Sequence, residues 1–162
     1  MANGDYPRGF ECVGEPIRVS VYESGSECFP GDLLNLASDG QVDPAAAGGI
    51  ILGVCLSYAS ASGVKVLVAD HPDQIISGQA DETEVDVQSD IGNMCDHLGT
   101  AGNSTYKTSR QEIDSSTIGT SAAGLMIIGL DRQVGNAFGA QAKVICKINE
   151  HRLGTGAGQA GV

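Results

Sequence analysis

Residues 50–69 read IILGVCLSYASASGVKVLVA, in which two apolar runs flank a turn rich in Ser and Gly. In the second run Val64, Val66 and Val68 alternate with other residues. A period of two and many β-branched side chains are typical of strands rather than helices. The two runs therefore predict a β-hairpin whose first strand, within 49–58, is central to the fold.

The same pattern extends outward over most of the chain. We expect further strands at 16–23, 31–37, 74–77, 83–87, 125–130 and 142–149, and a short strand followed by a turn at 112–117. Gly, Asp, Asn and Ser separate them, and Asp39-Gly40 is typical of a hairpin turn. No segment predicts an amphipathic helix of more than about three turns. The sequence thus predicts an all-β fold, a single compact β-barrel or β-sandwich.

Alternate residues of the predicted strands supply the expected core. These residues are Ile17, Val19 and Val21; Ile50, Leu52, Val54 and Leu56; Val64, Val66 and Val68; and Val144, Cys146 and Ile148. A chain of 162 residues is long enough to bury such a core in one domain.

The two ends of the chain differ in composition from this domain, which we place at 16–151. Residues 1–15 mix Gly, Pro and Asp with a few bulky side chains, so we expect an extended N-terminal arm that is not a strand of the core. Residues 152–162 are Gly-rich and predict a flexible tail.

Three aromatic residues are the candidate contacts with a partner protein. Tyr6 and Phe10 lie in the expected arm, and Phe138 lies in the turn-rich segment 132–139, where we expect it to be exposed. Aromatic anchors of this kind often carry most of the binding energy of an interface.

Charge excludes several classes of partner. The chain has 20 acidic and 9 basic residues, for a net charge of −11. Binding DNA, RNA or an anionic membrane requires clustered Lys and Arg, so we expect none of these partners. The N-terminus shows no basic region followed by an apolar run, and no apolar stretch approaches 20 residues. We therefore expect no secretory signal, and folding in a reducing cytoplasm.

The residues that usually bind metals are scattered. The five cysteines include no CxxC pair, so neither a metal site nor a cofactor is expected. Residues 66–106 contain eight acidic residues and no Lys or Arg. Within this stretch 70–73 and 81–84 could gather oxygens for Ca²⁺ or Mg²⁺, but they lack the spacing of an EF-hand. The stretch could equally meet a basic surface on a partner.

Catalytic motifs are also missing. Asp96-His97 with Ser104 or Ser109 is the one conceivable hydrolytic set, and no GxSxG nucleophile elbow accompanies it. The loop 99–104 is Gly-rich but lacks the Gly-Lys-Ser/Thr ending of a phosphate-binding loop. We therefore expect no enzymatic activity.

The order of the turn and strand motifs resembles a known group of proteins. The chain has GDLLNL at 31–36, DGQV at 39–42, AAAGGIILGV at 45–54, EIDSS at 112–116, MIIGL at 126–130 and GAQAKVICKINEH at 139–151. Together these motifs resemble the small virion proteins of tailed bacteriophages, over about residues 16–151.

The resemblance implies a capsid decoration, or cement, protein. Such a protein is made in the host cytoplasm, sits on the outside of the virion and bridges subunits of the major capsid protein, often as a homotrimer. A receptor- or glycan-binding β-module, such as a head fibre knob or an adhesin, is the alternative. The absence of Trp and the presence of only four Tyr count against a glycan platform.

Overall fold

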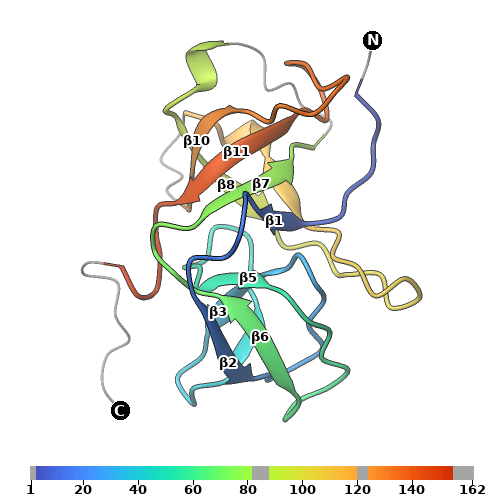
Figure 1. Cartoon of the computed structure of the whole chain (residues 1–162), viewed down its shortest axis with the longest axis vertical. Helices are drawn as coiled ribbons and strands as arrows, with labels where there is room; N and C mark the ends of the chain where they lie inside the picture. Colours follow the sequence, from blue (N-terminus) through green and yellow to red (C-terminus); the bar gives the residue numbers. More distant parts are fainter. Residues whose placement is uncertain (1–2, 82–87, 120–123, 155–162) are drawn as a thin grey trace.

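Two curled antiparallel β-sheets contain all the strands of the structure (Figure 1). The structure is a computed structural model that describes residues 3–81, 88–119 and 124–154. The strands are β1 Phe10–Cys12, β2 Val19–Glu23, β3 Leu33–Leu36, β4 Val42–Pro44, β5 Gly53–Cys55, β6 Lys65–Ala69, β7 Ile75–Gln79, β8 Met94–Leu98, β9 Glu112–Asp114, β10 Leu125–Leu130 and β11 Lys143–Ile148. Two short 3₁₀-helices, η1 Gln88–Asp90 and η2 Ser115–Thr117, are the only helices in these ranges. The predicted all-β barrel or sandwich is therefore confirmed.

Each sheet curls until its ends approach each other. The six-stranded sheet has the order β1-β7-β11-β10-β8-β9, and a bridge between Ala80 and Ile113 brings β9 back to the end of β7. The five-stranded sheet has the order β2-β6-β5-β3-β4, and a bridge between Ser24 and Val42 brings β4 back to the end of β2. The predicted hairpin of residues 50–69 is the antiparallel β5–β6 pair at the centre of this second sheet. No helix of the described ranges has the length and apolar character to cross a membrane.

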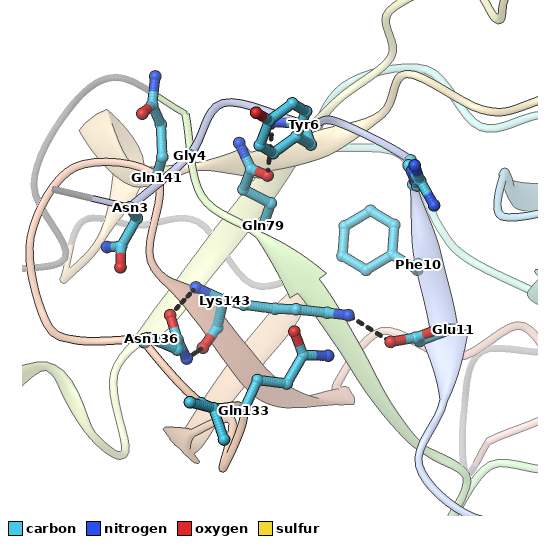
Figure 2. Close-up of a pocket in the computed structure, with 14 residues that line it drawn as sticks. Asn3, Gly4, Tyr6, Phe10, Glu11, Gln79, Gln133, Asn136, Gln141 and Lys143 are labelled. Atoms are coloured by element: carbon cyan, nitrogen blue, oxygen red, sulfur yellow. Dashed lines mark hydrogen bonds and ion pairs between the residues drawn. The ribbon is translucent and has the colours of Figure 1, made fainter.

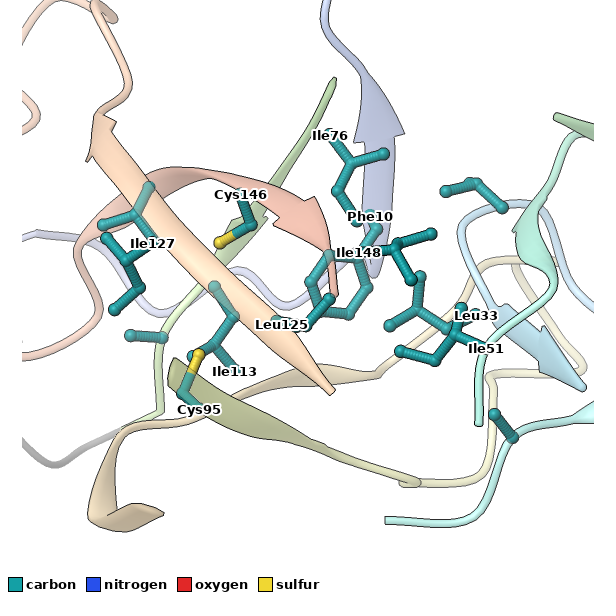
Figure 3. Packing of buried hydrophobic residues seen from close by; sticks show 14 of the residues in the cluster. Phe10, Leu33, Ile51, Ile76, Cys95, Ile113, Leu125, Ile127, Cys146 and Ile148 are labelled. Carbon is teal, nitrogen blue, oxygen red and sulfur yellow. The ribbon is translucent and has the colours of Figure 1, made fainter. Parts of the chain in front are cut away.

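Two apolar clusters fill the interior. The larger contains Phe10, Ile76, Leu125, Ile127 and Ile148 of the six-stranded sheet, and Figure 3 shows Leu33 and Ile51 packing beside them. Because residues of both sheets contribute to it, this cluster joins the two halves of the molecule. The smaller cluster lies inside the five-stranded sheet and consists of Cys28, Leu34, Val42, Leu52, Cys55, Ala59, Val66 and Val68.

The structure corrects the predicted extent of several strands. The apolar run at 49–58 forms only the short β5. The strands β4 and β8 lie between the predicted strands, where no strand was expected. These strands are short or carry polar residues, so the alternation of side chains gives little signal. The predicted strand at 83–87 and most of the predicted tail lie outside the described residues. Where the tail begins, His151 forms a β-bridge with Ile51, and the N–H of Arg152 donates to the carbonyl of Ile51.

The expectation that residues 1–15 stand apart from the core is wrong. Phe10–Cys12 form β1, which pairs with β7 along the edge of the six-stranded sheet. The N–H of Phe10 also donates to the carbonyl of Gly31 at 2.8 Å, and that of Val13 to Ile75 at 2.9 Å. Backbone pairing of this kind is independent of side-chain pattern, so a three-residue strand leaves no periodic trace in the sequence.

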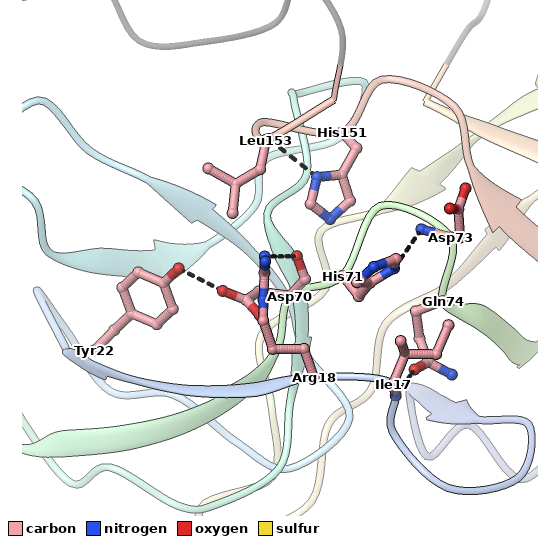
Figure 4. A network of polar contacts seen from close by, with 9 residues as sticks. All are labelled: Ile17, Arg18, Tyr22, Asp70, His71, Asp73, Gln74, His151 and Leu153. Carbon is pink, nitrogen blue, oxygen red and sulfur yellow. Dashed lines mark hydrogen bonds and ion pairs between the residues drawn. The ribbon is translucent and has the colours of Figure 1, made fainter.

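The predicted core face of β2 is also wrong. Ile17, Val19 and Val21 are exposed, whereas the alternate residue Tyr22 packs against the smaller cluster. The hydroxyl of Tyr22 donates to the buried carboxylate of Asp70 at 2.7 Å, and Arg18 donates to the same carboxylate at 2.8 Å (Figure 4). Because successive side chains of a strand point to opposite faces, these two bonds place the apolar set outside.

Candidate functional site

The three predicted contact residues have different environments. Tyr6 is 74% exposed, Phe138 is half-buried against the larger cluster, and Phe10 is only 2% exposed. Phe10 is therefore a core residue and has no surface to offer to a partner. Tyr6 and Phe10 line one cavity, which Phe138 does not reach.

An apolar surface that the sequence placed in the core is the first candidate site. Ile17, Val19, Val21 and Leu67 are each between 43% and 60% exposed, and Val21 is the direct cross-strand partner of Leu67. We call these four residues the outer apolar face of β2–β6. Contiguous apolar side chains on the solvent side of a terminal strand are typical of protein–protein contact surfaces. The alternation of apolar residues in the sequence placed Ile17, Val19 and Val21 on one face of the strand. It did not indicate whether that face is buried or exposed.

A polar cavity of about 630 Å³ is the second candidate site. It lies between residues 3–11 and residues 133–143, and Figure 2 shows Tyr6, Gln79 and Gln133 around it. Pockets for small ligands usually measure about 300–1,000 Å³, so the cavity has the size of a ligand site. Sequence reasoning singled out Tyr6 and Phe10 but missed the rest of the lining, because residues far apart in the chain supply it.

Three side-chain amides hold the walls of this cavity together. Asn3 donates to the carbonyls of Ala137 and Ala140 at 2.8 and 2.9 Å and accepts from the N–H of Ala137. Gln79 accepts from the N–H of Tyr6 at 3.2 Å. Asn136 bonds the backbone of Lys143 in both directions (Figure 2). The N-terminal segment is thereby fixed to the 133–143 loop.

The conceivable hydrolytic set does not assemble. His97 is fully buried, its Nε2 lies 3.1 Å from the carbonyl of Ala45, and burial lowers its pKa. The hydroxyl of the buried Ser109 accepts from the N–H of Gln111, and no hydrogen bond joins it to His97. Ser104 is exposed, and no hydrogen bond joins its side chain to His97. The histidine is thus a core residue rather than a base beside a nucleophile.

The expected oxygen-rich loop at 70–73 pairs with cations of the protein itself. Asp70 forms an ion pair with Arg18. Asp73 forms one with Lys147, whose Nζ lies 3.1 Å from the Oδ1 of Asp73. Burial would raise the pKa of Asp70, but hydrogen bonds from Arg18 and Tyr22 outweigh it and lower the pKa. Within the described ranges no three His, Cys, Asp or Glu side chains gather as metal ligands. The other candidate, 81–84, lies outside those ranges except for Asp81.

The Gly-rich loop at 99–104 does not form a phosphate site. Residues 99–102 line a cavity of about 280 Å³ together with Glu27 and Asp32. Burial raises the pKa of Asp32, whose carboxylate accepts from the N–H of Phe29 at 2.9 Å. Carboxylates beside the loop would repel a phosphate group.

No known protein family model matches the chain, and no curated protein resembles it in sequence. The two candidate sites therefore rest on the residues and geometry of this chain alone.

Proposed function

We propose that this protein is a capsid decoration protein, which binds the outside of an assembled phage capsid and bridges its major capsid protein subunits. The observation that carries the proposal is the outer apolar face of β2–β6. Four apolar side chains on the solvent side of a sheet contribute nothing to its core. A protein that binds other proteins can instead bury them at the interface. The motif order that resembles small virion proteins supplies the identity of the partner.

Physical reasoning supports such a role. A capsid must resist the internal pressure of its packaged genome. A protein that contacts two neighbouring subunits adds buried interface area between them and needs no catalytic activity to do so. The net charge of −11 keeps free copies apart and away from the genome.

Co-sedimentation with preformed, expanded capsids of the parent virus tests this function. The wild-type protein should sediment with the capsids and raise their melting temperature. Replacing Val21 and Leu67 together by Ser should weaken binding by at least about tenfold, since two apolar contacts are lost. The matched control is Val134→Ser, which alters a fully exposed valine of another surface. Absence of binding, or equal loss in the control, would contradict the proposal.

We further propose that the protein works as a homotrimer. A trimer applies one binding face three times around an axis, so that moderate contacts add up by avidity. Analytical ultracentrifugation should then give roughly three times the chain mass of 16.6 kDa. A monomer at concentrations that saturate capsids would overturn the trimer and leave the decoration role standing.

A further inference from the structure

The polar cavity between residues 3–11 and 133–143 has features of a ligand site that the capsid role does not explain. Its walls are fixed in place by the bonds of Asn3, Gln79 and Asn136 described above. A site whose walls are already ordered loses little conformational entropy when a ligand binds. What the cavity could bind is decided by the side chains that those bonds leave free.

Four polar groups of the lining have no hydrogen-bond or ion-pair partner within the described part of the chain. Among the residues that the structure describes, the side chains of Arg8, Gln133 and Gln141 make no hydrogen bond or ion pair, and the Tyr6 hydroxyl makes none. Side-chain amides both donate and accept, which suits the hydroxyl groups of a sugar. A guanidinium without a counter-ion suits a carboxylate, which it can bind through two parallel hydrogen bonds.

The ring of Tyr6 packs against the backbone of Gly4. A Cβ at Gly4 would lie 2.4 Å from Cε2 of Tyr6, so the ring rests directly against the glycine backbone. Most of the ring nevertheless stays open to solvent, and its backbone N–H is fixed by Gln79 (Figure 2). An exposed aromatic ring of this kind offers a flat apolar surface for one side of a sugar ring.

The charge of the lining selects among sugars. Lys143 forms an ion pair with Glu11, which leaves Arg8 as the charged side chain of the lining that has no ion-pair partner among the described residues. In a chain with a net charge of −11, an unpaired cation in a cavity favours an anionic ligand at that point.

We propose that this cavity binds a sugar that carries one carboxylate, a uronic or sialic acid residue of a polysaccharide. The carboxylate pairs with Arg8, the ring lies on Tyr6, and its hydroxyls bond to Gln133 and Gln141. The site does not rest on the capsid role, because the isolated protein should bind the sugar without any capsid present.

Isothermal titration of the purified full-length chain tests the site. The probes are a galacturonic acid trisaccharide, its methyl ester, a glucuronic acid oligosaccharide and a sialic acid trisaccharide. We expect at least one acid to bind, and the methyl ester to bind about tenfold more weakly than the galacturonic acid trisaccharide if that acid is the ligand. For the other acids, the corresponding neutral sugar serves as the comparison. Binding of none of the acids, or equal binding of an acid and its neutral counterpart, would overturn the proposal.

Paired variants separate the site from the rest of the surface. Arg8→Gln should weaken binding of the acid by about tenfold and leave the weak binding of the neutral form unchanged, and Tyr6→Ala should weaken both. The controls are Arg110→Gln and Tyr106→Ala, which alter an exposed cation and a 76% exposed ring away from the cavity. Thermal unfolding checks that each variant is folded, and Gln133→Ala provides a further test if Arg8→Gln is not. Equal affinity of the cavity variants and the controls would rule the site out.

Discussion

The ring of Phe10 lies directly on the backbone of Gly78, its antiparallel partner in β7. A Cβ at Gly78 would be 2.4 Å from Cε1 of the ring, closer than carbon atoms can approach. Glycine at this position therefore makes the space in which the ring is buried. This contact, together with the pairing of β1 with β7, turns the expected N-terminal arm into part of the core.

The Phe10–Gly78 contact predicts a large loss of stability when either residue is changed. Phe10→Ala should lower the free energy of unfolding by about 3–5 kcal/mol, because it leaves a cavity in the larger cluster. Gly78→Ala should also destabilise, since the added Cβ must displace the ring. Denaturant unfolding measures both. Tyr6→Ala is the control and should change stability by less than about 0.5 kcal/mol; equal effects of Tyr6 and Phe10 would contradict the structure.

Truncation distinguishes the two parts of the N-terminal segment. Removing residues 1–15 deletes β1 and Phe10, so the melting temperature should fall sharply, whereas an arm outside the core could be removed with little effect. A chain that starts at Arg8 retains β1 and should stay folded, although it loses the sugar site. A thermal melt of both proteins decides the matter, and an unchanged melt for the shorter chain would show that β1 is dispensable.

Buried histidines predict a loss of stability in mild acid. Burial lowers the pKa of His151 to about 4, although the nearby Asp70 carboxylate acts in the opposite direction. Its ordinary pKa of 6.5 applies in the unfolded chain, so the unfolded state binds the proton first as the pH falls. Stability should be full above pH 6.5 and decrease between 6.5 and about 4, by at most about 3 kcal/mol from this residue.

A variant of His151 isolates this contribution. His151 accepts a hydrogen bond from the N–H of Leu153 through Nδ1 (Figure 4), and the side-chain oxygen of Asn can replace that acceptor. The unfolding free energy of His151→Asn should depend less steeply on pH over the same range. A residual slope is expected from His97, whose pKa burial also lowers. Identical slopes in wild type and variant would contradict a buried neutral His151.

The hydrogen bonds among Arg18, Asp70 and Tyr22 predict that removing the Tyr22 hydroxyl lowers the stability of the protein. Tyr22→Phe removes a hydrogen bond to a buried carboxylate and should destabilise the protein by about 1.5–3 kcal/mol at neutral pH. Because acid protonates Asp70, the difference between variant and wild type should shrink at low pH. Tyr106→Phe is the control, since Tyr106 is exposed. Unfolding curves at neutral and acidic pH provide the measurement.

Thiol reactivity reports on the same packing. All five cysteines are free, and four of them, Cys28, Cys55, Cys95 and Cys146, are buried. Burial raises the pKa of Cys28, Cys55 and Cys95 to about 12, so their reactive thiolates are nearly absent at pH 8. Iodoacetamide should therefore label only Cys12 in the native protein and all five in denaturant, as mass spectrometry of peptides would show. Rapid native labelling at Cys146 would contradict the packing of the larger cluster.

Sequence patterns were sufficient where a strand is long and alternates. In β11 the predicted inward set of Val144, Cys146 and Ile148 is buried, and β10 has the predicted bounds of 125–130. In both cases burial on one face imposes a period of two that the sequence must carry. The all-β class, the hairpin at 50–69 and the absence of long helices from the described ranges follow from the same rule.

Alternation in the sequence did not reveal which face of β2 is buried. Val19 and Val21 form a regular apolar set, but the bonds of Arg18 and Tyr22 to Asp70, some 50 residues later, turn that set outward. The pattern of one strand specifies that its two faces differ, and only the neighbouring strands determine which one meets the core.

The sequence by itself thus determined the strand class, most strand positions and the lack of any recognisable catalytic motif. The tertiary structure alone decided that Phe10 is buried, that the outer apolar face of β2–β6 is exposed and that Tyr6 and Arg8 share a cavity with Gln133 and Gln141. The physical reason is that local periodicity arises within a few residues of chain. A cavity or a contact surface is instead made by segments far apart in sequence, which only the packed fold brings together.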